Sequence, residues 1–338
     1  MTTATAPADG LISRARLILP GAGTALLVAA AASFVADTYG GPVMLLALLI
    51  GIALNFLSEG DKVGAGIRFT SKTILKLGVA LLGLRIAASD VLALGTGTVV
   101  ELIAAMAITI FAGLLLSRAQ KRTPAFGMLV GGATAICGAS AALAISSALP
   151  DNGSKDRETV FTVVAVTTLS TIAMVVYPVI ANLFGFDDRA TGILLGATIH
   201  DVAQVVGAGY AVSEEAGDTA TIVKLFRVAM LLPVVFLVSL AFRGEAAGAV
   251  KGKLPIPLFA IGFIAMVAVN SLGLMPDMLR APLVDLSRWC LIAAVAAIGL
   301  TTSIPDMLKI GRSAVLTAVA TTLVLLGAIL TFLSLTIS

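Results

Sequence analysis

The sequence is poor in charge and in the residues that build soluble active sites. Of its 338 residues only 12% are charged, with one histidine, two cysteines and one tryptophan. So little charge excludes a soluble domain or a nucleic-acid-binding protein of this length. Cys137 and Cys290 both fall in apolar stretches, so we expect neither a structural disulfide nor a thiol-based metal site. Strand-like alternation is missing too, which argues against a membrane barrel.

Apolar residues dominate instead, at 59% of the chain and a mean hydropathy of +1.07. A membrane-spanning helix needs about 20 apolar residues, because a span must satisfy its own backbone hydrogen bonds. We predict an all-α polytopic membrane protein with about eleven transmembrane helices, at 20–36, 42–57, 72–88, 97–117, 125–149, 158–184, 189–212, 220–242, 254–272, 286–304 and 312–335.

Basic residues predict the orientation of these spans. With the N-terminus inside, fourteen Lys and Arg residues fall in inner segments and five in outer ones, including Lys155 and Arg157 outside and Arg189 inside. Residues 1–19 are then a cytoplasmic segment, retained because no cleavage site followed by a soluble domain appears, and 20–338 are one transmembrane transporter domain.

The chain also resembles itself weakly over 42–117 and 257–335. Shifts of 215 and 216 residues align Asn55 with Asn270 and a set of further pairs, Pro42 with Pro257, Asp90 with Asp306 and Gly95 with Gly311. The paired spans are seven crossings apart, so the copies face opposite ways, as in secondary transporters with a site near the midplane. The alternative is chance alignment of apolar helices rich in Leu, Ala and Gly.

Four small or polar residues in the window 125–149 are candidate substrate ligands, namely Thr134, Cys137, Gly138 and Ser140. The glycines of this window weaken a continuous helix. A break near Gly138 would let Ser140 cap a second half-helix, whose free N–H groups suit an anion. The alternative is close packing, because small residues let membrane helices approach each other.

The window 189–212 holds the single histidine, His200, with Asp201 and Gln204. Ionisable groups at membrane depth are expensive and usually functional, and histidine titrates near physiological pH. We expect His200 and Gln204 to bind substrate and His200 and Asp201 to couple transport to protons. The alternative is a buried pair that pins two helices together. A zinc site is not expected, since a second histidine and a thiol cluster are missing.

Lys224 and Arg227 lie three residues apart in the window 220–242 and project from one face of a helix. Two cations near a histidine predict an anion subsite, with a guanidinium suited to an oxyanion. The alternatives are snorkelling to headgroups or pairing with Asp201 or Glu214. Asn55 and Asn270 are secondary candidates that could face each other across a pore or equally cap helix ends.

Two motifs carry a family resemblance, the run Gly-Gly-Ala-Thr-Ala-Ile-Cys-Gly-Ala-Ser-Ala-Ala at 131–142 and His-Asp-Val-Ala-Gln-Val at 200–205. With them the chain resembles the YeiH-type sulfate exporters of bacterial inner membranes, from about residue 20 onward. The resemblance implies inverted repeats, a panel domain, and a core domain with crossed discontinuous helices. It also implies export of sulfate or a related sulfur oxyanion, and by analogy a homodimer.

We therefore expect a multi-pass secondary transporter of a small inorganic anion, coupled to protons or another ion. No nucleotide-binding loop appears, and we expect no enzyme activity, cofactor or bound metal. The alternative is a cation–proton antiporter that uses Asp201 as its mid-membrane carboxylate. An intramembrane enzyme or a channel has little support in the residues.

Overall fold

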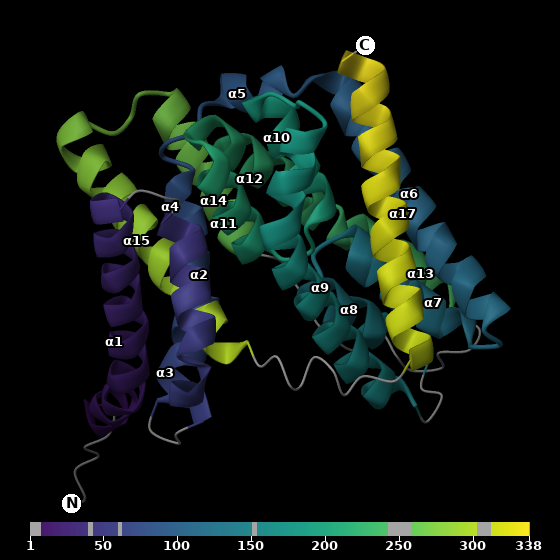
Figure 1. The fold of residues 1–338 in the computed structure, drawn as a ribbon, viewed down its shortest axis with the longest axis horizontal. Coiled ribbons are helices and arrows are strands. Elements are labelled where there is room, and N and C mark those ends of the chain that lie inside the picture. The colour runs from purple at the N-terminus through teal and green to yellow at the C-terminus, as the bar shows by residue number, and fades with distance from the viewer. Residues whose placement is uncertain are drawn as a thin grey trace, which may run out of the picture. The chain divides into compact units, whose positions relative to one another are not determined.

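The computed structural model describes residues 8–39, 43–59, 63–150, 154–242, 258–302 and 312–337. Within these ranges the regular structure is helical, and the chain divides into two compact units. Unit 1 comprises Met1–Arg85 and Gly262–Ser303, and unit 2 comprises Ile86–Ile261 and Ile304–Ser338. Figure 1 traces the chain from α1 to α17.

Unit 1 is built around one long helix. It contains α1 (Ala8–Tyr39), α2 (Val43–Ala53), η1 (Asn55–Glu59), α3 (Gly64–Phe69), η2 (Thr70–Ile74), α4 (Leu75–Leu82), most of α14 (Leu258–Ser271) and α15 (Asp277–Thr301). α15 packs against α1, α2 and α4. Gly51 and Gly299 bring α2 and α15 into backbone contact, since a Cβ atom at Gly51 would lie 2.5 Å from the Ala296 carbonyl oxygen. Such small-residue contacts are typical of membrane helices.

Unit 2 holds the remaining helices, from α5 to α13 and α17. Their bounds are α5 (Ala88–Ala93), α6 (Gly95–Ala119), α7 (Pro124–Ala135), α8 (Ala139–Ala148), α9 (Lys155–Leu183), α10 (Asp188–Thr198), α11 (Val202–Val212), α12 (Glu214–Ala229), α13 (Leu231–Ala241) and α17 (Arg312–Ile337). α9 packs against α7, α8, α10, α11 and α17, and α6 lies beside α17 (Figure 1). A buried apolar cluster of Phe126, Val130, Ala165 and Ala318 joins α7, α9 and α17.

Helices α7 and α8 form a hairpin. A Cβ atom built on Gly132 would lie 2.3 Å from Cδ1 of Ile145, thirteen residues further along the chain. In a straight helix that separation would be about 20 Å, so α8 must turn back along α7. Arg122 forms an ion pair of 3.8 Å with Glu158, which places the start of α7 beside the start of α9.

Helices α10 and α11 form a second hairpin. Cβ atoms built on Gly192 of α10 and Gly209 of α11 would both contact Ala216, in the first turn of α12. Both arms therefore lie along the same part of α12. Because α9 leads from the end of α8 to the start of α10, the two hairpins open at opposite ends of α9.

These hairpins correct two predicted crossings. The windows 125–149 and 189–212 were each expected to cross the bilayer, but each returns to the end of unit 2 from which it entered. Their arms have 10 to 12 residues, about 15–18 Å or half the hydrocarbon thickness. The result moves Lys155 and Arg157 to the end that holds Arg122, and Arg189 to the opposite end, which strengthens the predicted positive-inside bias.

The other nine windows overlap helices where the structure describes them, although the window 72–88 runs past the end of α4 into a non-helical stretch at 83–87. Six helices of the described chain are long and apolar enough to cross a membrane: Arg16–Tyr39, Gly95–Ala119, Arg157–Leu183, Glu214–Ala241, Asp277–Thr301 and Val315–Thr336. Five further apolar helices are shorter. The chain is thus a helical protein with several candidate spans. Residues 1–7 and four residues used to align the repeats, Pro42, Pro257, Asp306 and Gly311, lie outside the described residues.

Candidate functional site

The tip of the first hairpin is the predicted break at Gly138, which the structure confirms. α7 ends at Ala135, and α8 begins at Ala139 after Gly138, which has φ +62°. An L-residue rarely adopts that conformation, so a glycine fits here. The N-cap of α8 is Gly138, without a side-chain cap. The expected cap by Ser140 is therefore wrong, because Ser140 sits one residue inside the helix.

The tip of the second hairpin is a break that we did not predict. α10 ends at Thr198, Ile199 has an extended backbone, and Asp201 is the N-cap of α11. The Asp201 carboxylate accepts a hydrogen bond of 3.2 Å from the Ala203 amide. The Asp201 amide in turn donates to the Ser170 hydroxyl of α9 at 2.9 Å. Asp201 thus has a capping role in this hairpin.

The two tips meet in the interior of unit 2. A Cβ atom at Gly138 would lie 3.4 Å from Cβ of His200. Lys224 of α12 joins the tips, since its Nζ donates to the carbonyls of Ile136 at 2.7 Å and Ile199 at 2.9 Å. The side chain of Lys224 is completely buried.

Arg227, one turn further along α12, joins the same two hairpins. Its Nε donates to the Ala135 carbonyl and its Nη2 to the Thr134 carbonyl, both at 2.9 Å. Its Nη1 donates to the carbonyls of Gly196 at 2.9 Å and Ile199 at 3.0 Å. We call Lys224 and Arg227 the cationic clamp.

The clamp has a clear electrostatic reason. The last carbonyls of a helix have no partner within that helix and form its negative end. Two such ends, from α7 and α10, are buried here, and α12 supplies two cations to them. Four of the five guanidinium N–H groups of Arg227 are therefore occupied. Direct binding of an oxyanion by Lys224 and Arg227 stays a prediction, and these contacts give both residues a structural role.

Helix α17 contacts both hairpins through adjacent threonines that the sequence did not single out. The Thr321 hydroxyl lies 3.2 Å from the Thr134 hydroxyl of α7. The Thr322 hydroxyl lies 3.0 Å from Nε2 of His200. Two of the predicted site residues, Thr134 and His200, are thereby tied to the same helix.

The structure brings most of the predicted ligands together around the two tips. Thr134, Cys137, Gly138, His200 and Gln204 are buried, Asp201 is partly buried and Ser140 is exposed. Nδ1 of His200 and Oε1 of Gln204 are buried and have no hydrogen-bond partner among the described residues. In the described chain, no group of three or more His, Cys, Asp and Glu side chains is placed to hold a metal ion.

Asn55 and Asn270 lie elsewhere, in unit 1. Nδ2 of Asn55 donates to the Leu300 carbonyl at 2.7 Å, near the end of α15. Oδ1 of Asn270 accepts from Nη1 of Arg280 at 3.4 Å, near the start of α15. Twenty residues of helix separate these two places, or about 30 Å. The predicted pairing of the two asparagines across a pore is therefore wrong.

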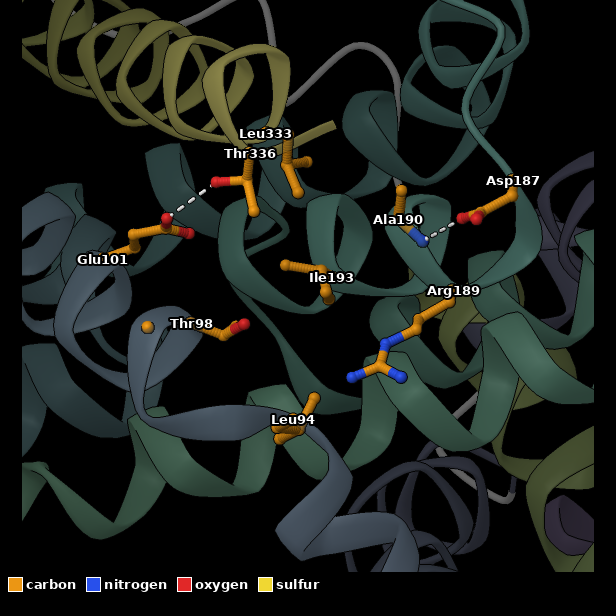
Figure 2. A pocket seen from close by; sticks show the side chains of 10 residues that line it. Leu94, Thr98, Glu101, Asp187, Arg189, Ala190, Ile193, Leu333 and Thr336 are labelled. Atoms are coloured by element: carbon orange, nitrogen blue, oxygen red, sulfur yellow. Dashed lines mark hydrogen bonds between the residues drawn. The ribbon is translucent and has the colours of Figure 1, made fainter. Parts of the chain in front are cut away.

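One pocket of about 400 Å³ lies between the start of α6, the start of α10 and the end of α17 within unit 2. Figure 2 shows Glu101 and Arg189 on opposite sides of it, with the Thr336 hydroxyl donating to Glu101 at 2.9 Å. Asp187 caps α10 at its rim by accepting from the Ala190 amide at 2.7 Å. None of the predicted site residues lines this pocket.

Comparison with known proteins identifies the family. A family model described as Conserved hypothetical protein 698 matches residues 18–318. The chain is 50% identical to the UPF0324 membrane protein TauZ of Paracoccus pantotrophus, over 94% of this chain and 95% of that protein. It is 49% identical to a UPF0324 membrane protein of Chlorobaculum tepidum, over 90% of this chain and 86% of the relative.

A UPF0324 membrane protein of Bacillus cereus is 35% identical, over 87% of this chain and 88% of the relative. No solved structure matches the chain. The relatives extend over nearly the whole chain and are named as membrane proteins, which agrees with the resemblance drawn from the two motifs. The chain belongs to the UPF0324 family of membrane proteins.

Proposed function

We propose that the protein is a secondary carrier of a small inorganic oxyanion of the sulfate or sulfite type, bound at the tip of the α7–α8 hairpin. One observation carries the proposal: the N-terminus of α8 has no side-chain cap and lies beside two buried cations. The amides of Ala139 and Ser140 have no partner within the described residues. Free amides at a helix N-terminus attract anions.

The charges around this N-terminus favour an anion. Lys224 and Arg227 are buried, and Asp201 is the carboxylate that interacts with Lys224. The Cys137 side chain lies close enough to both cations to feel their charge. Two positive charges against one negative charge leave an excess of about one positive charge, which is costly in a buried site unless an anion balances it.

Ser140 gives this subsite a hydroxyl that a substrate can reach. It is exposed, and it occupies the second position of α8, next to the free amides. A small oxyanion there would accept hydrogen bonds from the two amides and the hydroxyl. The arms of the two hairpins lead to opposite ends of α9. Movement of one hairpin or the other would therefore connect the tip to one side of the membrane or the other, as alternating access requires. Coupling to protons or another ion, and export as the direction, belong to the same proposal.

A cation–proton antiporter using Asp201 is the competing function. Asp201 accepts from the Ala203 amide and interacts with Lys224. A metal cation would have to replace the capping contact and approach two buried positive charges. The geometry therefore favours the anion carrier.

The test is uptake of labelled sulfate and sulfite into proteoliposomes across imposed pH gradients. In Ser140→Asp, a carboxylate would occupy the free amides, and we expect saturable oxyanion flux to fall about tenfold or more, the effect of roughly 1.4 kcal/mol of competition. Ser147→Asp is the matched control, because Ser147 is an exposed serine at the other end of α8. It should transport like the wild type.

Two results would overturn the proposal. One is the absence of saturable flux of either oxyanion in the wild type. The other is equal transport by Ser140→Asp and Ser147→Asp. A sodium-dependent pH change that Asp201→Asn abolishes, in vesicles without oxyanion flux, would establish the antiporter instead.

A further inference from the structure

The buried ammonium group of Lys224 has an unusual bonding pattern for a charged group. Its side chain has no exposed surface, and its Nζ donates to two carbonyls, Ile136 and Ile199. An ammonium has three N–H donors, whereas a neutral amine has two. Both observed hydrogen bonds can therefore survive the loss of one proton.

We propose that Lys224 is the group that carries the coupling proton, so that an anion binds at the α8 N-terminus with Lys224 charged and leaves with Lys224 neutral. This inference rests on the proposed anion site and adds a mechanism for its coupling. Loss of the proton changes the charge of the cluster without opening the contact between the hairpin tips. Lysines buried in proteins are known to serve as proton-exchanging groups.

A change of protonation would cost more free energy at the other ionisable groups around Lys224. They are Arg227 on the same helix, Cys137 at the first tip, and His200 and Asp201 at the second. A guanidinium keeps its proton. Protonation of Asp201 would weaken the cap on the Ala203 amide.

His200 was the predicted proton carrier, and its contacts argue against that role. Its Nε2 is paired with the Thr322 hydroxyl, while Nδ1 is buried without a partner among the described residues. A charged imidazole would donate from both nitrogens. It would bury its charge and face the positive charges of Lys224 and Arg227, which the Thr134 carbonyl beside the ring offsets only in part.

The charge balance sets the stoichiometry. With Lys224 charged, the two cations and Asp201 leave about one positive charge, which attracts an oxyanion and balances one of the two negative charges of sulfate. With Lys224 neutral, Arg227 and Asp201 balance each other, and only the free amides of α8 are left to attract an anion. About one proton should therefore be taken up with each anion bound.

The experiment counts protons on the full-length protein in detergent. Titration with sulfate, which does not itself titrate near neutral pH, is followed calorimetrically in two buffers of different ionisation enthalpy. If the vesicles transport only sulfite, the titration uses sulfite in place of sulfate. The protonation of sulfite itself is then measured in a titration without protein and subtracted. We expect uptake of about one proton per anion in the wild type and about none in Lys224→Arg, whose charge is permanent. In vesicles, Lys224→Arg should move the anion down its own gradient but not respond to a pH gradient.

A second set of variants decides the matter if Lys224→Arg does not fold. Cys137→Ser and His200→Gln should each keep the proton uptake per bound anion. Its loss in either of them would assign the proton to that residue and overturn the inference, as would unchanged proton uptake in Lys224→Arg. Failure of the wild type to bind either oxyanion would instead refute the proposed function.

Discussion

Replacement of Arg227 by leucine should open the contact between the two hairpin tips. Arg227 donates hydrogen bonds to the carbonyls of Thr134, Ala135 and Gly196, whereas the Ile199 carbonyl also accepts one from Lys224. Three buried carbonyls without partners cost about 1–3 kcal/mol each. Removing a buried charge offsets several kcal/mol of that sum. We expect a net cost of about 3 kcal/mol, or roughly a hundredfold higher population of the open tip.

The two cysteines provide the assay. Cys137 lies at the first hairpin tip in unit 2 and Cys290 lies on α15 in unit 1, and both are buried. Arg227→Leu should raise the rate of maleimide labelling at Cys137 by about a hundredfold, since labelling follows the open population. Labelling at Cys290 should not change, which makes it the internal control.

Arg280→Leu is the matched arginine variant. Its ion pair of 2.9 Å with Asp277 is largely exposed, and such pairs contribute about 0–1 kcal/mol. It should leave Cys137 labelling at the wild-type rate. If Arg227→Leu labels Cys137 no faster than Arg280→Leu and melts at the wild-type temperature, the clamp does not hold the tips.

Two further predictions concern α17 and the hairpin topology. Thr322→Val removes the hydroxyl beside Nε2 of His200 and should cost about 1 kcal/mol of stability in thermal unfolding, whereas Thr331→Val on the exposed side of α17 should cost less; equal melting temperatures would contradict it. The second prediction uses single cysteines in place of Gln120, Ser154 and Ser213, in a protein without its native cysteines. Those at 120 and 154 should react with an impermeant maleimide from the same side of the membrane, and the one at 213 from the opposite side. If 125–149 crossed the membrane, the cysteines at 120 and 154 would react from different sides.

The sequence predicts the spans better than the hairpins. Hydropathy locates 97–117 and 158–184 because each is one long apolar helix, α6 and α9. It cannot distinguish a crossing from two short arms, because both bury a similar number of apolar residues. A local signal did exist: Gly127-Met-Leu-Val-Gly131 and Gly192-Ile-Leu-Leu-Gly196 share one pattern. In the structure these glycines pack the first arms of the hairpins against α6 and α12.

The candidate site was predicted in its residues but not in its contacts. The cost of burying charge marks Lys224, Arg227 and His200 as important in any apolar window. Their partners are backbone carbonyls, which every residue carries, so no side-chain pattern could identify them. Thr321 and Thr322 were missed for a related reason, because threonine is common in membrane helices and usually bonds its own helix.

The two hairpins differ most at the place where the proposal puts the substrate. Their first arms share a glycine pattern, and α12 receives the carbonyl ends of both. The second arms, α11 and α8, begin differently. The carboxylate of Asp201 caps the N-terminal amides of α11, whereas the N-cap of α8 is Gly138, which has no side chain to cap the helix. A carboxylate at both tips would neutralise the cationic clamp and leave nothing for an anion to balance. One carboxylate at the α11 N-terminus and the free amides of Ala139 and Ser140 at the α8 N-terminus instead leave about one positive charge to attract an anion. Asp201 shows that a negative group binds at the equivalent position of α11.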